Sequence, residues 1–352
     1  MIITRTPLRI SLAGGGSDLP DYYRRYGGAV LGASINKFMY LSMHPYFFED
    51  GYLLKYSQTE RRSELDAVEH GIIREVFRLY RIRGVDFNSS ADIPSGTGLG
   101  SSSAFTVGLI HLCNAYNETY MSKEAMAEQA AHLEIDILGE PIGKQDQYAC
   151  ACGGLNYIRF NPDDTVAVEK LRLTSEGHKR LCGNLLMFYT GRSRNASEIL
   201  SRQKADTLTR KSADNLQRLV ALAGVLREEL QRNNIDAVGE ILHEGWTRKK
   251  ELAVGIADAD IDAWYETARK NGAEGGKLLG AGGGGFLLFY VKEENHARVR
   301  GALSMLRETS FRFESEGTSL IHYEADAYGS PRPAPSGGRF RAVEAPSVRA
   351  VL

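Results

Sequence analysis

The feature that most constrains this chain is a run of glycine and serine placed between an expected strand and an expected helix. Residues 94–103 read PSGTGLGSSS. A short strand is expected near 85–89, and residues 101–117 are apolar on nearly every side, which predicts a buried helix. Glycine allows tight backbone turns, and the first N–H groups of a helix have no partner within it. The segment therefore predicts a loop and a helix N-terminus that can bind an anion such as phosphate.

The spacing of this loop differs from three common nucleotide-binding motifs. No lysine follows the glycines, as a Walker A loop requires. Ser101 stands where the dinucleotide-binding fingerprint has its third glycine, which argues against a nicotinamide-dependent enzyme. The HRD and DFG signatures of protein kinases do not occur in the sequence. Taken alone, the segment is also compatible with a surface turn that caps a core helix.

Two further glycine-rich segments support a binding function over a simple turn. Residues 7–18 read PLRISLAGGGSD, and residues 277–286 read KLLGAGGGGF. Each of the three segments adjoins an expected strand. Glycine at such positions permits close approach between backbone and ligand. Together the three segments predict a cleft that holds a phosphate-bearing ligand.

Composition and charge exclude several other classes of protein. With 352 residues, 43% of them hydrophobic, the chain is long enough for about two domains. A formal net charge of -1 gives no reason to expect a nucleic-acid or anionic-membrane partner. No signal peptide and no apolar stretch of about 18–20 residues is found, so we expect a cytoplasmic protein. Four cysteines without CxxC spacing, and histidines without a metal motif, predict neither disulfides nor a zinc site.

Hydrophobic periodicity places strands and helices in separate blocks, which predicts an α+β fold. Leu8, Ile10 and Leu12 alternate with polar or small residues, which predicts a strand with one buried face. Further strands are expected at about 28–35, 38–44, 52–57, 85–89, 154–160, 166–171, 185–190, 276–280, 285–291, 310–314 and 318–324. Helices are expected at 66–82, 101–117, 122–138 and 293–307, with Ser122 as the N-cap of the third. A mostly helical stretch is expected from about 195 to 271, with a break around Asn233 and Asn234. Residues 326–352 are rich in Pro, Gly, Ala and Arg and are expected to form a flexible tail.

The three glycine-rich segments, in this order, resemble the three motifs of the galactokinase, homoserine kinase, mevalonate kinase and phosphomevalonate kinase (GHMP) superfamily. The resemblance runs from about residue 4 to 324. It implies an N-terminal ribosomal protein S5 domain 2-like domain at 1–175 and a C-terminal ferredoxin-like domain at 176–325. The active site would lie in the cleft between them. The implied activity is transfer of a phosphoryl group from ATP, with Mg²⁺, to a hydroxyl group.

The resemblance also assigns roles to individual residues. The phosphate loop would hold ATP through Pro94, Gly96, Gly98, Leu99, Gly100, Ser101, Ser102 and Ser103. Ser102 matches the serine that contacts Mg²⁺, and Glu134 matches the second metal ligand, although an exposed helix carboxylate is the alternative for Glu134. Asp146 would be the catalytic carboxylate that orients the acceptor hydroxyl and removes its proton. Arg9 matches the family arginine beside it and would pair with Asp146.

A finer resemblance concerns the acceptor. Residues 12–21, 34–37, 143–148, 153–157 and 188–196 are similar to bacterial D-glycero-α-D-manno-heptose 7-phosphate kinases. This similarity implies phosphorylation of the anomeric O1 to give the 1,7-bisphosphate, in nucleotide-activated heptose biosynthesis for surface polysaccharide. Residues 188–196 also resemble L-fucokinases, so a fucokinase-like enzyme stays open. A non-catalytic sugar sensor on the same fold would be expected to lack Asp146, Glu134 or Ser102.

An acceptor that already carries a phosphate requires a basic pocket. The expected substrate-binding residues are Gly15, Gly16, Ser17, Asp18, Lys37, Lys144, Gln147, Arg192, Arg194, Gly282 and Gly283. Asp18 would bind sugar hydroxyls, but its GGGSD context departs from the GEHTD of galactokinases and counts against galactose. Arg74 lies on an expected helix and is more consistent with a solvated surface charge. The expected partner is thus a small sugar phosphate; the oligomeric state, a homodimer included, stays open.

Overall fold

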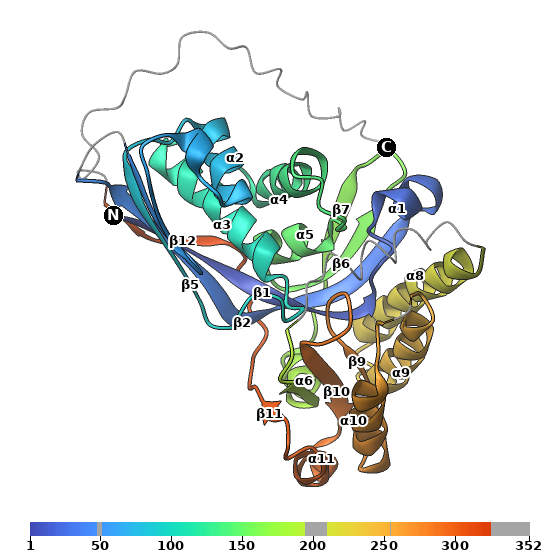
Figure 1. Ribbon diagram of the computed structural model, residues 1–352. Helices are drawn as coiled ribbons and strands as arrows, with labels where there is room; N and C mark the ends of the chain where they lie inside the picture. Colours follow the sequence, from blue (N-terminus) through green and yellow to red (C-terminus); the bar gives the residue numbers. More distant parts are fainter. Residues whose placement is uncertain (48–50, 194–209, 254, 325–352) are drawn as a thin grey trace.

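Two β-sheets organise the computed structural model, which describes residues 1–47, 51–193, 210–253 and 255–324 (Figure 1). The strands of the large sheet are β1 (Ile2–Gly14), β2 (Gly28–Pro45), β3 (Tyr52–Lys55), β4 (Thr59–Arg62), β5 (Val85–Ala91), β6 (Leu155–Phe160), β7 (Val166–Lys170) and β12 (Ser319–Tyr323). The small sheet contains β8 (Leu185–Tyr189), β9 (Ala273–Leu278), β10 (Phe286–Val291) and β11 (Arg307–Glu308).

The helices fall into two groups. The first group consists of α1 (Pro20–Tyr26), η1 (Leu65–Ala67), α2 (Gly71–Tyr80), α3 (Ser101–Tyr116), α4 (Lys123–Ala131), η2 (His132–Ile137) and α5 (Gln145–Cys152). The second consists of α6 (Ser175–Gly183), α8 (Arg210–Gln231), α9 (Ala237–Lys250), α10 (Ala259–Lys270), η3 (Glu293–Asn295) and α11 (His296–Ala302). Figure 1 shows α2 to α5 on one side of the long strands β1 and β2, and α8 and α9 on the other.

The long antiparallel pair of β1 and β2 forms the centre of the large sheet. β1 also pairs with β12 on its other edge, and β2 pairs with both β5 and β6. Alternating Leu8, Ile10 and Leu12 are all buried, as the sequence pattern predicts. The predicted break between strands 28–35 and 38–44 is wrong. The pairing partner shifts from Phe38 to Ile35 across one step of β1, so the chain bulges there and continues as a single strand.

Helix α3 is the buried helix that the apolar pattern predicts. Most of its residues are buried, and it contacts both β1 and β2. Its N-cap is Gly100, whose φ of 76° lies in the left-handed region that glycine adopts readily. Helix α4 is capped by Ser122, whose hydroxyl accepts a hydrogen bond from the backbone N–H of Ala125. The predicted helix 122–138 is present but ends in the wider π-helical turn η2.

The C-terminal half follows the predicted order with shifted boundaries. The helical stretch contains α8, α9 and α10, and α8 ends at Gln231, next to the predicted break. Helix α11 ends at Ala302, earlier than predicted, and β11 lies at 307–308 in place of 310–314. The predicted tail at 326–352, and the first part of the predicted helical stretch up to 209, lie outside the described residues. No helix among the described residues is long and apolar enough to cross a membrane.

The path of the chain links the two sheets at the end of the described region. After the small sheet, the chain returns to the large sheet as β12 and pairs antiparallel with β1. The backbone N–H of Gly154 and the carbonyl of Glu314 are hydrogen-bonded, which holds this returning segment beside the start of β6. The division at residues 175 and 176 stays a prediction.

Candidate active site

A cavity of about 340 Å³ opens where the three glycine-rich segments meet. Its walls come from β1 and the loop that follows it, the phosphate loop, the start of α3, η2, the residues before α5, the end of α9, and β9 with its glycine loop. The charged and polar side chains that line it are Arg9, Ser11, Asp18, Ser101, Ser102, Ser103, Glu134, Glu140, Gln145, Asp146, Lys249 and Lys277. The sequence prediction of one shared cleft agrees with this arrangement.

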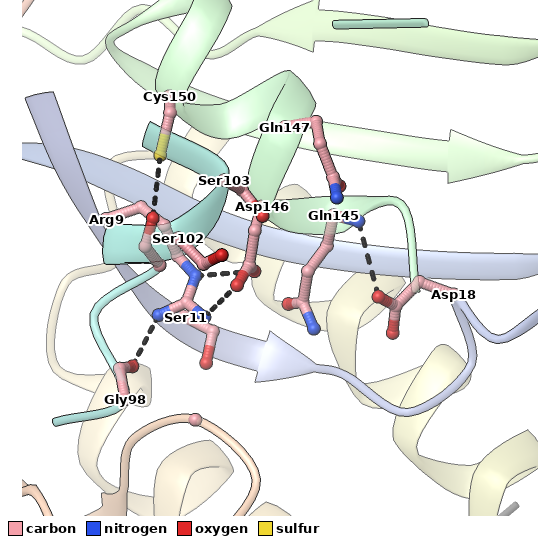
Figure 2. A network of polar contacts seen from close by, with 12 residues as sticks. Arg9, Ser11, Asp18, Gly98, Ser102, Ser103, Gln145, Asp146, Gln147 and Cys150 are labelled. Carbon is pink, nitrogen blue, oxygen red and sulfur yellow. Dashed lines mark hydrogen bonds and ion pairs between the residues drawn. The ribbon is translucent and has the colours of Figure 1, made fainter. Parts of the chain in front are cut away.

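Arg9 and Asp146 form a bidentate ion pair at the cavity wall (Figure 2). Arg9 lies in β1 and Asp146 in the first turn of α5. The Nε of Arg9 donates to Oδ1 of Asp146 at 2.7 Å, and Nη2 donates to Oδ2 at 2.6 Å. Nη1 donates to the carbonyl of Gly98 in the phosphate loop at 2.6 Å. The arginine, which is 5% exposed, therefore fixes the carboxylate and the phosphate loop relative to each other.

Glu134 is the centre of a buried hydrogen-bond cluster. Its carboxylate accepts from Ser102 Oγ at 3.2 Å, Ser103 Oγ at 3.0 Å, Thr106 Oγ1 at 3.0 Å and Gln147 Nε2 at 2.6 Å. Burial raises the pKa of Glu134 to about 7, although these donors act in the opposite direction. The alternative of an exposed helix carboxylate is wrong, because the π-helical turn η2 directs Glu134 toward α3, where it is 1% exposed.

The residues at this cluster fit a magnesium ion. Mg²⁺ prefers oxygen ligands and in kinases is bound by one or two carboxylates together with substrate phosphates. The Glu134 carboxylate and the exposed hydroxyl of Ser102 supply such oxygens next to the phosphate loop. Among the described residues, no group of three or more His, Cys, Asp or Glu is placed to hold a metal. A metal bound here would therefore need the phosphate oxygens of a nucleotide as further ligands.

Asp18 lies in the loop after β1 and faces the same cavity. Its Oδ2 accepts a hydrogen bond from the backbone N–H of Gln145 at 3.3 Å, as Figure 2 shows. A Cβ on Gly143 would overlap this carboxylate, so glycine is required where the loop before α5 passes it. Burial, and secondarily the charge of Asp146, raises the pKa of Asp18 to about 6. The predicted sugar-binding acid and the predicted catalytic acid therefore lie at one site.

The other predicted residues of the first glycine-rich loop divide into two kinds. Gly15 and Gly16 line the cavity beside Asp18. Ser17 is buried, and its hydroxyl donates to the carbonyl of Ala29 at 3.0 Å and accepts from the N–H of Ala29 at 3.1 Å. The hydroxyl of Ser17 thus fastens the loop to β2.

Among the described residues, the predicted basic residues Lys37, Lys144 and Arg192 do not line the cavity. Lys37 is at the bulge of β2 and is half-buried. Lys144 pairs with Asp164 at 3.5 Å and lies over the ring of Tyr23. The predicted residue Arg194 lies outside the described residues.

Two other basic residues are held by local partners. Arg192 donates to Asp258 at 2.8 Å and also to Asp260. Arg74, in α2, donates to the carbonyl of Val68 at 2.6 Å and pairs with Glu75 at 3.3 Å, and it does not line the cavity.

Three of the predicted substrate-binding residues contact neighbouring residues of the protein: Gln147, Gly282 and Gly283. The amide of Gln147 donates to Glu134, and its Oε1 is buried with no hydrogen-bond partner among the residues that the structure describes. The N–H of Gly283 donates to the carbonyl of Ile256 at 2.9 Å. A Cβ on Gly282 would lie 2.7 Å from the Cα of Ile256, so this glycine permits close packing of the glycine loop.

Two lysines in the cavity lining were not singled out by the sequence. Lys249 is in the last turn of α9, and Lys277 is in β9. The sequence does contain an indication for Lys277, because it is the one charged side chain in the strand expected at 276–280. Lys249 gave no such signal, because it follows Arg248 and precedes Lys250 in a basic helix end that is normally solvated.

The phosphate loop and the last glycine-rich segment touch through their backbones. A Cβ on Gly98 would lie 2.5 Å from the carbonyl oxygen of Leu279, and a Cβ on Gly280 would lie 2.5 Å from the Cα of Gly98. Real Cβ atoms do not approach that closely, so both positions require glycine. Two of the three sequence motifs therefore meet directly, and β1 joins them through the Arg9 N–H, which donates to the carbonyl of Leu99 at 3.0 Å.

Comparisons with known proteins place these features in a family. The family model described as "GHMP kinases N terminal domain" matches residues 67–154, and "GHMP kinases C terminal" matches residues 226–305. A D-glycero-alpha-D-manno-heptose 7-phosphate kinase from Campylobacter jejuni is 30% identical over 305 residues, which cover 82% of this chain and 89% of that protein.

Solved structures share the fold. A putative sugar kinase from Campylobacter jejuni superimposes with a TM-score of 0.73 at 27% identity, covering 91% of this chain and 97% of that one. A D-glycero-D-manno-heptose 1-phosphate kinase from Bacteroides thetaiotaomicron gives a TM-score of 0.76 at 24% identity, covering 92% and 100%, and supports the fold alone. The fold predicted from the sequence is confirmed.

Proposed function

The chain belongs to the GHMP kinases, and we propose that it phosphorylates the anomeric hydroxyl of a heptose 7-phosphate. Its named relatives include several sugar kinases, and kinases of this family use ATP as the phosphoryl donor. The proposed acceptor is D-glycero-α-D-manno-heptose 7-phosphate and the proposed product its 1,7-bisphosphate. Identity of 30% to the Campylobacter jejuni enzyme over most of both chains supports this acceptor.

The observation that carries the kinase proposal is the Arg9–Asp146 pair beside the phosphate loop. A carboxylate held by an arginine can accept a hydrogen bond from the acceptor hydroxyl and later take its proton. The acceptor oxygen then forms a bond to the γ-phosphorus as the bond from that phosphorus to the ADP oxygen breaks. Asp146 would orient the hydroxyl, and Arg9 would hold Asp146 and the Gly98 carbonyl in place.

The phosphate loop would hold the nucleotide. Backbone N–H groups at the start of α3 are unpaired within the helix and favour bound phosphate oxygens. Ser102 and Glu134 would hold Mg²⁺, which when bound would offset the negative charge of the phosphates. Occupation by a cation would also relieve the cost of burying the Glu134 carboxylate.

The acceptor would lie against the loop after β1. The Asp18 carboxylate can accept hydrogen bonds from sugar hydroxyls, which act as donors. Gly15 and Gly16 have no Cβ and would let the sugar approach the backbone. This placement brings the sugar between Asp18 and Asp146, the two carboxylates of the cavity.

ADP release with a panel of acceptors tests the proposal. The panel contains heptose 7-phosphate, free heptose, mannose 6-phosphate, L-fucose, galactose and mevalonate, each with MgATP. We expect the highest kcat/KM with heptose 7-phosphate and a new phosphorus resonance coupled to the anomeric proton. Turnover of L-fucose or galactose, without turnover of heptose 7-phosphate or mannose 6-phosphate, would refute the heptose assignment. The family membership would be unaffected.

The matched variant for this assay is Asp146→Asn, which keeps the size of the side chain and removes its charge. Loss of a positioned general base typically lowers turnover by about 10²–10⁴-fold. We therefore expect ADP release to fall by about that factor while MgATP binding, measured by calorimetry, changes little. Undiminished turnover in the variant would remove Asp146 from the mechanism.

A further inference from the structure

Two lysines in the cavity lack a role in the reaction described above. Lys277 is 5% exposed, and its Nζ donates to the hydroxyl of Ser11 at 3.2 Å. Lys249 donates to the backbone carbonyls of Leu278, at 3.2 Å, and Gly280. Both side chains line the same cavity as Arg9 and Asp146. Their ammonium groups thus reach the site from the C-terminal half of the chain.

Neither ammonium forms a direct ion pair in the part of the chain that the structure describes, although the charges of Asp18 and Asp146 act on Lys249 from a distance. Their hydrogen-bond acceptors are neutral: a serine hydroxyl and two backbone carbonyls. The nearby carboxylate of Asp146 is already engaged by Nε and Nη2 of Arg9. Burying a charged group without a counter-charge is costly, and burying two close together is costlier. Burial, together with the charges of Lys249 and Arg9, holds the pKa of Lys277 well below its usual range.

Such an arrangement is expected where an anion completes the site. A bound phosphate would favour the protonated form of both amines, and lysine is a common point-charge ligand for phosphate. The pair is also placed for a ligand that enters the cavity, because Gly280, which accepts from Lys249, contacts the phosphate loop at Gly98.

We propose that Lys249 and Lys277 form a phosphate-binding subsite in the active-site cavity. The group that they bind is either the phosphate that the acceptor already carries or the phosphoryl group in transfer. As a refinement of the same site, the proposal rests on the kinase function proposed above. It assigns the C-terminal half of the chain a direct part in holding substrate.

Binding of inorganic phosphate tests the subsite without any sugar. The melting temperature is measured with saturating MgADP, so that the nucleotide positions are filled, and with added phosphate or with chloride at equal ionic strength. We expect phosphate to raise the melting temperature of the wild type and of Lys250→Met. Lys250 is the matched control, since it lies in the same turn of α9 and pairs with Asp262 outside the cavity. The phosphate effect should be lost in Lys277→Met and in Lys249→Met.

Kinetics with the phosphorylated sugar distinguish the two sources of phosphate. Losing one charged hydrogen-bonding partner is expected to weaken binding by about 10- to 100-fold. If the acceptor's own phosphate binds here, the KM for heptose 7-phosphate rises by that factor while the KM for ATP is unchanged. If the transferred phosphoryl group binds here, kcat falls with every acceptor.

Two outcomes overturn the subsite. One is a phosphate-dependent shift that is absent in the wild type, or equal in the wild type and both methionine variants. The other is a change of less than about threefold in kcat and in KM for both variants. Such a change would be smaller than the effect expected from losing one charged hydrogen bond. Methionine has about the same length as lysine and carries no charge that must be buried. The variants should therefore fold. Should the wild type turn over no phosphorylated sugar, the heptose assignment fails, and the phosphate-binding measurement still decides the subsite.

Discussion

The site is built from charged side chains held in a buried setting. Glu134 and Asp18 are 1% and 3% exposed, and burial raises the pKa of each carboxyl, to about 7 and about 6. Groups of this kind cost stability in the ligand-free protein and are typical of functional sites. They are retained where a ligand, here a cation or a sugar hydroxyl, restores the interactions that water would have made. The cost should therefore be measurable in the ligand-free state.

Replacing Asp18 with asparagine should stabilise the ligand-free protein above pH 6. The folded-state pKa of about 6 exceeds the ordinary value of 3.8, so the unfolded chain releases the proton first as pH rises. Asp18 therefore makes its full contribution to the free energy of unfolding below about pH 4, and this contribution is lost as the pH rises to about 6. The difference between the two pKa values corresponds to on the order of 3 kcal/mol of unfolding free energy. Urea unfolding at pH 8 should show a gain approaching that size, which vanishes near pH 4.

The control for this measurement is Glu244→Gln, an exposed carboxylate on α9. It should change the unfolding free energy by less than about 0.5 kcal/mol at either pH. An equal gain for Asp18→Asn at pH 4 and pH 8 would show that the charge of Asp18 is not the cause. The same variant should also lose affinity for the acceptor, since a carboxylate that accepts sugar hydroxyls is gone.

At the scale of elements, the active site depends on two loops that fit together without side chains. The phosphate loop and the loop after β9 meet at Gly98, Leu279 and Gly280. This contact joins the start of α3 in the N-terminal half to β9 in the C-terminal half. Because both loops use backbone atoms at their contact, one added methyl group is enough to separate them.

Gly98→Ala should destabilise the protein and reduce turnover. The residue has a φ of 82°, and the added Cβ would lie 2.5 Å from the carbonyl oxygen of Leu279. Left-handed strain and overpacking together are expected to cost roughly 2–4 kcal/mol. Gly224→Ala in α8 is the matched control: its Cβ meets nothing within 4 Å, so a gain of about 0.5–1 kcal/mol is expected. Urea unfolding measures both, and equal effects would contradict the proposed contact.

The sequence predicted those features that are encoded locally. The glycine-rich loops, the apolar helix α3 and the Ser122 cap depend on neighbouring residues, and the structure contains all of them. The Arg9–Asp146 pair was predicted from motif resemblance, and the two side chains do meet. The alternation of Leu8, Ile10 and Leu12 likewise gave the buried face of β1.

Features that depend on long-range packing were missed. The break predicted within β2 failed because pairing with β1 absorbs the extra residues as a bulge, which local propensity does not register. Lys249 was missed because a basic helix end is normally solvated, and only the packing of α9 against β9 brings it to the cavity. The turn η2 was missed because a π-helical turn has no simple sequence signature.

At the scale of the whole molecule, the two halves share one core. The buried apolar side chains form a continuous cluster that runs from Ile2 to Leu303. α8 and α9, from the C-terminal half, contact β1 of the large sheet. The chain end returns through Thr318, whose hydroxyl contacts Thr6 at 2.9 Å and His111 at 3.0 Å. A continuous apolar core of this kind is expected to couple the two halves, in contrast to the more polar contacts between loosely tethered domains.

We therefore expect the protein to unfold in a single transition. Both tryptophans, Trp246 in α9 and Trp264 in α10, report on the C-terminal helices, whereas far-UV circular dichroism reports on the whole chain. If the shared core couples the halves, urea midpoints from the two signals coincide. MgATP, which we propose binds at the phosphate loop, should then raise both midpoints by the same amount. A fluorescence midpoint well below the circular dichroism midpoint would show instead that the C-terminal helices unfold alone, and MgATP would then move the two signals unequally.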